Sequence, residues 1–150
     1  MADVRQYIRI NPVDTQTDVA VGVPLPFDAE GVFNLTYTTQ EQMKSNILNI
    51  LLTEPGERVF KPDFGVGLRN YLFENFTDTE DLRERITSQV EVYAPDIEIL
   101  NVDLNKDPNS HTLSVNIYYR VLVNNEVDAI QVNFAPDEGL NDMSPSITSY

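Results

Sequence analysis

The sequence predicts an α+β fold, with helices packed on a small, mainly antiparallel C-terminal sheet and an extended N-terminal arm. Two segments with apolar residues at helical spacing come first, and three segments with alternating apolar residues follow them. Strands that follow helices, rather than alternating with them, favour α+β over β/α. We expect an arm over residues 1–38, a core domain over residues 39–135 and a polar tail over residues 136–150.

The composition suits one modest domain and argues against several classes of partner. The chain has 150 residues, 41% apolar content and a net charge of −14. An acidic surface repels phosphate backbones and anionic lipid, so neither nucleic acid nor membrane is expected as a partner. Because the chain has no cysteine and only one histidine, His111, we expect no disulfide, no His-based metal site and no Ser–His pair.

The arm carries strand-like patches that favour ordering against a neighbour, although a flexible terminus remains the alternative. Residues 19–23 alternate valines and fit a short strand before Pro24, and residues 32–37 fit another. The first helix is expected to begin with Thr39 as N-cap and Gln42 at the capping-box position. Its apolar stripe consists of Met43, Ile47, Leu48, Ile50 and Leu51.

Two further helices and three strands follow in the predicted core domain. A short helix is expected over residues 68–75, and a longer one is capped by Thr77 and stopped by Pro95. The longer helix buries Leu82, Ile86, Val90 and Tyr93. Strands are expected over residues 97–104, 112–123 and 130–134, with a bulge where the alternation slips at Ile99 and a turn at residues 124–125.

No set of residues stands out as catalytic, cofactor-binding or metal-binding. A glycosidase needs two carboxylates at a defined separation, and among 24 acidic residues chance pairs such as Glu54 and Glu57 are abundant. No calcium-loop pattern occurs, and Gly65 and Gly67 lack the Lys-Ser/Thr ending of a phosphate loop. We therefore expect a protein that is not an enzyme and has no cofactor.

The loop over residues 52–76 is the most distinctive segment, and we interpret it as a rigid connector between helices. Arg58 lies beside the Val59–Phe60 pair, which is expected to be buried, so its guanidinium needs a carboxylate such as Glu74 or helix carbonyls. A surface arginine with a packed stem is the alternative. The residues expected to hold the loop are Gly56, Arg58, Pro62, Phe64, Gly65, Leu72, Phe73 and Glu74.

The strand at residues 112–123 has two interpretations. It could be an edge strand that accepts a strand from another chain, or an ordinary central strand. Tyr118, Arg120 and Leu122 lie on the face opposite its apolar set, where they are expected to touch a partner.

The motifs GER at residues 56–58, KPDFG at 61–65, LFENFT at 72–77 and DLRERITSQVEVYAP at 81–95 occur in this order. Together they resemble the baseplate wedge proteins of contractile-tailed phages, a family regarded as tail-sheath initiators and formerly described as baseplate lysozymes. The similarity runs roughly from Thr39 to Phe134. The arm and the tail lie outside it.

The resemblance implies a structural role in the virion tail baseplate, for a protein made in the cytoplasm of the host bacterium. The implied partners are the helical bundle of larger wedge subunits and the sheath protein, which adds strands to the sheet, with tail tube or hub proteins as further candidates. An equivalent subunit of a non-phage injection system and a peptidoglycan-cleaving hydrolase remain alternatives.

One departure from the family affects the expected wedge contact. Where members often carry a Glu-Pro-Arg triplet, this chain has Ala94, Pro95 and Asp96, so both charges are missing. A salt-bridge role is not transferred, and a partner contact through Tyr93 and Pro95 remains the expectation.

Overall fold

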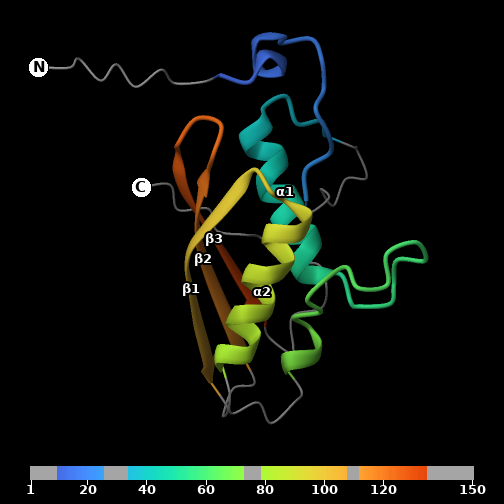
Figure 1. The fold of residues 1–150 in the computed structure, drawn as a ribbon, viewed down its shortest axis with the longest axis vertical. Coiled ribbons are helices and arrows are strands. Elements are labelled where there is room, and N and C mark those ends of the chain that lie inside the picture. The colour runs from blue at the N-terminus through green and yellow to red at the C-terminus, as the bar shows by residue number, and fades with distance from the viewer. Residues whose placement is uncertain (1–9, 26–33, 73–78, 108–111, 135–150) are drawn as a thin grey trace, which may run out of the picture.

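The computed structural model describes residues 10–25, 34–72, 79–107 and 112–134, and these residues form a two-layer α+β fold. One layer is the helix pair α1 (Thr39–Leu52) and α2 (Thr79–Tyr93), and the other is a three-stranded sheet (Figure 1). The predicted fold class is confirmed. No helix of the described residues is long and apolar enough to cross a membrane.

The sheet is an antiparallel meander in the order β1 (Ile97–Asp107), β2 (Thr112–Val121), β3 (Val127–Phe134). The central position of β2 confirms the central-strand interpretation and rules out β2 as a free edge. The predicted bulge is present, because the register shifts between Ile99 and Asn101 and thereby returns Val102 to the buried face. The predicted β2–β3 turn is confirmed by Asn125, whose φ is +59°.

The core lies between the helix layer and one face of the sheet. Every second residue of β2 is buried, and the predicted apolar stripes of both helices are buried, with Tyr93 half-buried. The N-cap of α1 is Thr38 rather than Thr39, because the Thr38 hydroxyl accepts from the Glu41 N–H. The predicted cap of α2, Thr77, lies outside the described residues.

The arm and the short helix differ from their predictions. Neither residues 19–23 nor residues 34–37, the described part of the second predicted strand, form a strand. Gly22 makes a single antiparallel bridge with Thr36, and a 3₁₀ helix, η1 (Pro12–Thr15), precedes it. Since Pro24 has no N–H, it cannot continue a ladder, and one bridge remains. The predicted short helix is a 3₁₀ turn, η2 (Asn70–Leu72); Phe73 and Glu74 lie outside the described residues, as do residues 136–150.

Candidate functional site

The base of the loop after α1 satisfies the C-terminal end of that helix. A helix leaves its last carbonyl groups without intrahelical partners. Three consecutive loop N–H groups donate to these carbonyls: Val66 to Ile50 at 2.9 Å, Gly67 to Thr53 at 2.9 Å and Leu68 to Leu51 at 3.1 Å. The loop base is therefore joined to α1 through main-chain hydrogen bonds.

Gly65 brings this base close to both helices. Its φ is +104°, and a Cβ atom built on it would lie 2.2 Å from the Thr53 carbonyl oxygen. Its N–H donates to Gln89 Oε1 of α2 at 2.8 Å. Position 65 therefore requires glycine, and it connects the end of α1 to the C-terminal half of α2.

Aromatic and cationic side chains attach the loop to the end of α2. The buried Phe64 ring meets the Tyr93 ring edge-on, with centroids 4.8 Å apart and planes at 71°. The Arg58 guanidinium lies 4.2 Å above the Phe64 ring, and the Lys61 ammonium lies 5.4 Å from the Tyr93 centroid. We name this set of four side chains the aromatic stack.

The expectation that Arg58, Val59 and Phe60 are buried is wrong. All three are exposed, since the Gly56 N–H donates to the Pro62 carbonyl at 2.8 Å and closes residues 56–62 into a projection away from the core. Arg58 lies over the Phe64 ring and has no carboxylate or carbonyl partner among the described residues, while the expected partner Glu74 lies outside them. Figure 1 shows this loop projecting from the helix layer.

The predicted partner-binding residues fall into two places. Tyr118 and Arg120 lie on the sheet face away from the helices, where Arg120 forms an ion pair of 3.0 Å with Glu98 of β1. Leu122 lies in the turn beyond β2, and its N–H donates to the Asp96 carbonyl at 2.9 Å. This bond places Leu122 beside the α2–β1 connection.

Around that connection, the residues of the triplet position differ in exposure. Pro95 and Asp96 are exposed, while Ala94 is buried and its N–H donates to the Val90 carbonyl at 2.8 Å. Tyr93 is half-buried, because its ring belongs to the aromatic stack. Pro95 is thus exposed for the predicted contact, whereas the Tyr93 ring packs against Phe64 and only part of it is exposed.

A buried polar cluster, missed from the sequence, ties the N-terminal half of α1 to β3. Asp128 forms an ion pair of 2.7 Å with Lys44, accepts from the Gln40 amide at 3.2 Å and lies 3.5 Å from the Tyr119 hydroxyl. The signal was present, because Asp128 shares its face of β3 with the buried Ile130 and Val132. A carboxylate on an apolar face needs a partner.

The cluster shifts two ionisation equilibria. Burial alone would raise the pKa of Asp128, but the hydrogen bonds from Lys44, Ala129 and Gln40 and the charge of Lys44 outweigh it and lower the pKa. Burial raises the pKa of Tyr119, and the charge of Asp128 and its hydrogen bond raise it further. Asp128 is therefore a charged, paired carboxylate, and Tyr119 is a neutral donor.

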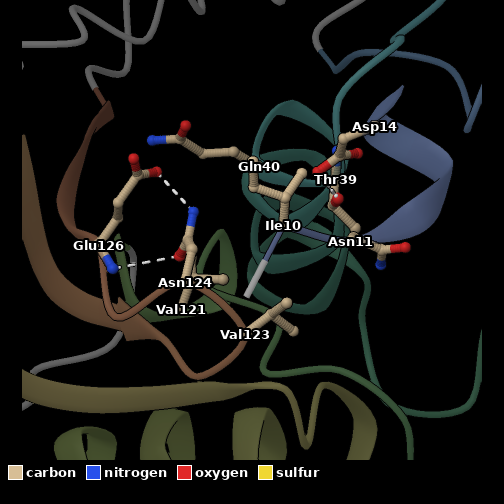
Figure 2. Close-up of a pocket in the computed structure, with 9 residues that line it drawn as sticks. All are labelled: Ile10, Asn11, Asp14, Thr39, Gln40, Val121, Val123, Asn124 and Glu126. Carbon is tan, nitrogen blue, oxygen red and sulfur yellow. Dashed lines mark hydrogen bonds between the residues drawn. The ribbon is translucent and has the colours of Figure 1, made fainter. Parts of the chain in front are cut away.

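A pocket of about 230 Å³ lies between the N-terminal segment, the start of α1 and the β2–β3 turn (Figure 2). Its two carboxylates both have local partners: Asp14 accepts from the Thr39 N–H and hydroxyl, and Glu126 accepts from the Asn124 amide. These contacts hold the arm on α1 and shape the turn. Within the described ranges, no group of three or more His, Cys, Asp or Glu side chains could hold a metal ion.

Glu54 and Glu57, the carboxylate pair weighed for hydrolysis, lie in the loop after α1. Glu57 accepts from the Glu54 N–H at 3.0 Å, which fixes the turn after α1. Glu74 lies outside the described residues. The arrangement of Glu54 and Glu57 thus serves the shape of the loop.

Comparison with known proteins places the core of the chain. The family described as baseplate wedge protein gp25 matches residues 38–126. The baseplate wedge protein gp25 of Enterobacteria phage T4 is 38% identical over 96 residues, which cover 62% of this chain and 73% of that protein.

One solved structure shares the fold, and a second has a lower similarity. A crystal structure of a Geobacter sulfurreducens protein, provisionally named a tail lysozyme, has a TM-score of 0.57 and 26% identity, over 68% of this chain and 95% of that one. A chain of the anti-feeding prophage baseplate, seen by cryo-electron microscopy, has a TM-score of 0.47 and 20% identity, over 79% and 86% of the two chains. The family match spans both helices, the loop and most of the sheet, and the chain belongs to the gp25 family of baseplate wedge proteins.

Proposed function

We propose that this protein is a non-enzymatic structural part of a contractile-tail baseplate wedge, and that the outer edge of β3 starts sheath assembly by accepting a strand of the sheath protein. Family membership and the T4 relative support the baseplate role. The observation that carries the strand-acceptor role is the difference between the two outer strands of the sheet.

The outer strand β1 is poorly suited to pair with another strand. It carries the bulge at Leu100, and exposed Glu98, Asp103 and Asp107 place charge along it. Bulges and charged side chains are features that block edge-to-edge pairing. A fourth strand added beside β1 would have to follow an irregular, acidic edge.

The outer strand β3 has the opposite properties. Its register with β2 is continuous from Val127 to Phe134. Its one charged residue, Asp128, is turned inward to Lys44. A straight edge without outward charge suits strand addition, in which main-chain hydrogen bonds supply the affinity.

The remaining surfaces suit the wedge partners. The open sheet face carries Tyr118 and Arg120 on the central strand β2, one strand in from the β3 edge, where a sheath segment that also crosses this face would touch them. Pro95 and Leu122 lie together at one end of the domain and would meet the helical bundle of the larger wedge subunits. We assign the arm, residues 1–38, whose described part is held on α1 through Asp14, and the tail, residues 136–150, to further contacts with other subunits.

The strand-acceptor role of β3 can be tested with a proline that removes an N–H group from the outer edge of β3 and leaves the hydrogen bonds to β2 unchanged. The Val121 N–H donates to the Glu126 carbonyl at 2.9 Å, so the main chain of residue 126 faces β2. Along β3 the N–H groups alternate between the β2 side and the outer side, and this alternation places the Asn133 N–H on the outer side, away from β2. We expect Asn133→Pro to fold, to enter baseplates and to stop sheath polymerisation on them, while Asn133→Ala supports normal polymerisation. Normal sheath growth on Asn133→Pro baseplates would rule out the β3 edge.

A proline at Val121 tests a different property. Because Val121 is buried on the central strand and its N–H is bonded, Val121→Pro disrupts the sheet itself. A loss of sheath growth in that variant would report unfolding and would carry no information about the edge.

A further inference from the structure

The outermost part of the loop forms a small closed turn with two apolar side chains at its tip. The Lys61 N–H donates to the Arg58 carbonyl at 3.0 Å, so Val59 and Phe60 occupy the two central positions of the turn. Their side chains are 87% and 97% exposed. We name residues 58–61 the tip turn.

The tip turn is held in place from below. The Gly56–Pro62 hydrogen bond closes its base, and its two cations rest on the rings of Phe64 and Tyr93. Phe64 is buried in the core. An exposed apolar pair on a fixed support loses little conformational freedom when it binds, which is the condition under which an apolar anchor contributes most.

The charges of the tip turn differ from those of the rest of the chain. The chain carries a net charge of −14, yet Arg58 and Lys61 flank the apolar pair. Across the described residues, neither cation has a carboxylate within ion-pair distance. No carboxylate of the described residues therefore competes with a partner for these two charges.

We propose that the tip turn inserts Phe60 and Val59 into an apolar pocket with carboxylates on its rim, on a different protein of the baseplate. The apolar pair supplies the anchor, and Arg58 and Lys61 supply charge complementarity. A second copy of this chain is disfavoured, because two chains of charge −14 repel each other. The inference rests on the proposed baseplate role but not on the β3 edge.

The first test identifies what surrounds Phe60 in the assembled machine. A photoreactive benzoylphenylalanine replaces Phe60 in the full chain, in baseplates of its own system, and the same probe at the exposed Leu100 is the control. We expect probe 60 to crosslink to one other baseplate protein, at apolar residues that have Asp or Glu beside them. Crosslinks of probe 60 to a polar surface, or none, would overturn the proposal.

The second test measures the contribution of the anchor. We expect Phe60→Ser to lower incorporation into baseplates at least about tenfold, as for loss of a buried aromatic anchor, while Leu100→Ser incorporates normally. Arg58→Glu and Lys61→Glu should also weaken incorporation, with a smaller effect at high salt. Because Phe60 is exposed, the thermal unfolding midpoint of Phe60→Ser should equal that of the wild type.

Two outcomes separate this proposal from its alternatives. If Phe60→Ser incorporates into baseplates like the wild type, the tip turn is not an anchor. The proposal that the β3 edge accepts a sheath strand is then still tested separately, by sheath growth on Asn133→Pro baseplates. If wild-type protein, but not Phe60→Ser, co-sediments with phosphatidylglycerol vesicles, the tip turn binds lipid and the protein-pocket proposal fails.

Discussion

The two ends of α1 are fixed to the domain in different ways. At the C-terminal end, the loop base supplies main-chain N–H groups to the last carbonyls, and Phe64 packs beside them in the core. At the N-terminal half, side chains make the attachment: the Asp14 carboxylate accepts a hydrogen bond from the Thr39 N–H, and Lys44 forms an ion pair with Asp128. The first attachment depends on backbone shape and apolar packing, and the second depends on charge. The two ends should therefore respond differently to mutation, pH and salt.

The largest loss of stability is expected from Phe64→Ala at the C-terminal end. It removes a buried ring and the support of Arg58 and Tyr93, and such truncations cost about 3–5 kcal/mol. Phe60→Ala is the matched control in the same loop, because its ring is exposed. Urea denaturation of both variants checks this, and equal midpoints would show that the aromatic stack does not stabilise the fold.

Gly65→Ala should come next. The added Cβ would press on the Thr53 carbonyl, and φ at +104° is strained for alanine, so we expect a loss of about 2–4 kcal/mol. Gly56→Ala is the control: its φ is +95°, but no atom lies within 4 Å of the added Cβ, and about 1 kcal/mol is expected. If both variants lose the same free energy of unfolding, the close approach at position 65 has no separate effect.

At the other end of α1, Lys44→Met should cost about 2 kcal/mol at neutral pH, because it leaves the Asp128 carboxylate buried without its cation, although water can still reach the position of the partly exposed Lys44 side chain. Adding Asp128→Asn to Lys44→Met should recover part of this loss, since no charge then remains to be compensated. Chemical denaturation of the single and double variants gives the comparison. A double variant less stable than Lys44→Met would contradict the role assigned to the pair.

The smallest expected effect is on the pH dependence. The pKa of Asp128 is lower in the folded protein than its ordinary value of about 3.9. Its contribution to stability is therefore present above about pH 4 and is lost as the pH falls through the folded pKa. The free energy of unfolding, measured from pH 5 to pH 2.5, should fall less steeply in Asp128→Asn than in the wild type. Parallel curves would show that Asp128 does not contribute.

The spacing of apolar residues predicted most of the fold, but the residue types in the loop after α1 did not predict the conformation of that loop. The stripes of α1 and α2, the bulge and the Asn125 turn follow from spacing and residue type. The position of Val59 and Phe60 could not be predicted, because their apolarity indicates burial, whereas the hydrogen bonds from Gly56 to Pro62 and from Lys61 to Arg58 close a turn that exposes them.

Contacts between residues distant in sequence were the other feature that the sequence did not predict. Lys44 and Asp128 are brought together by packing of α1 on β3, which no local pattern specifies. In the same way, the alternation of β2 could not show whether β2 lies at the centre or the edge of the sheet, since that depends on strand order. The inward position of Asp128 was the usable signal for the cluster.

The hydrogen bonds from Val66, Gly67 and Leu68 to α1 also have a kinetic consequence. These three amides can exchange with solvent deuterium only when the loop base separates from the helix end. The last turn of α1 and the loop base should therefore open as one cooperative unit, with similar protection factors. The wedge protein would thus present its projecting loop as a stiff extension of the α1 helix.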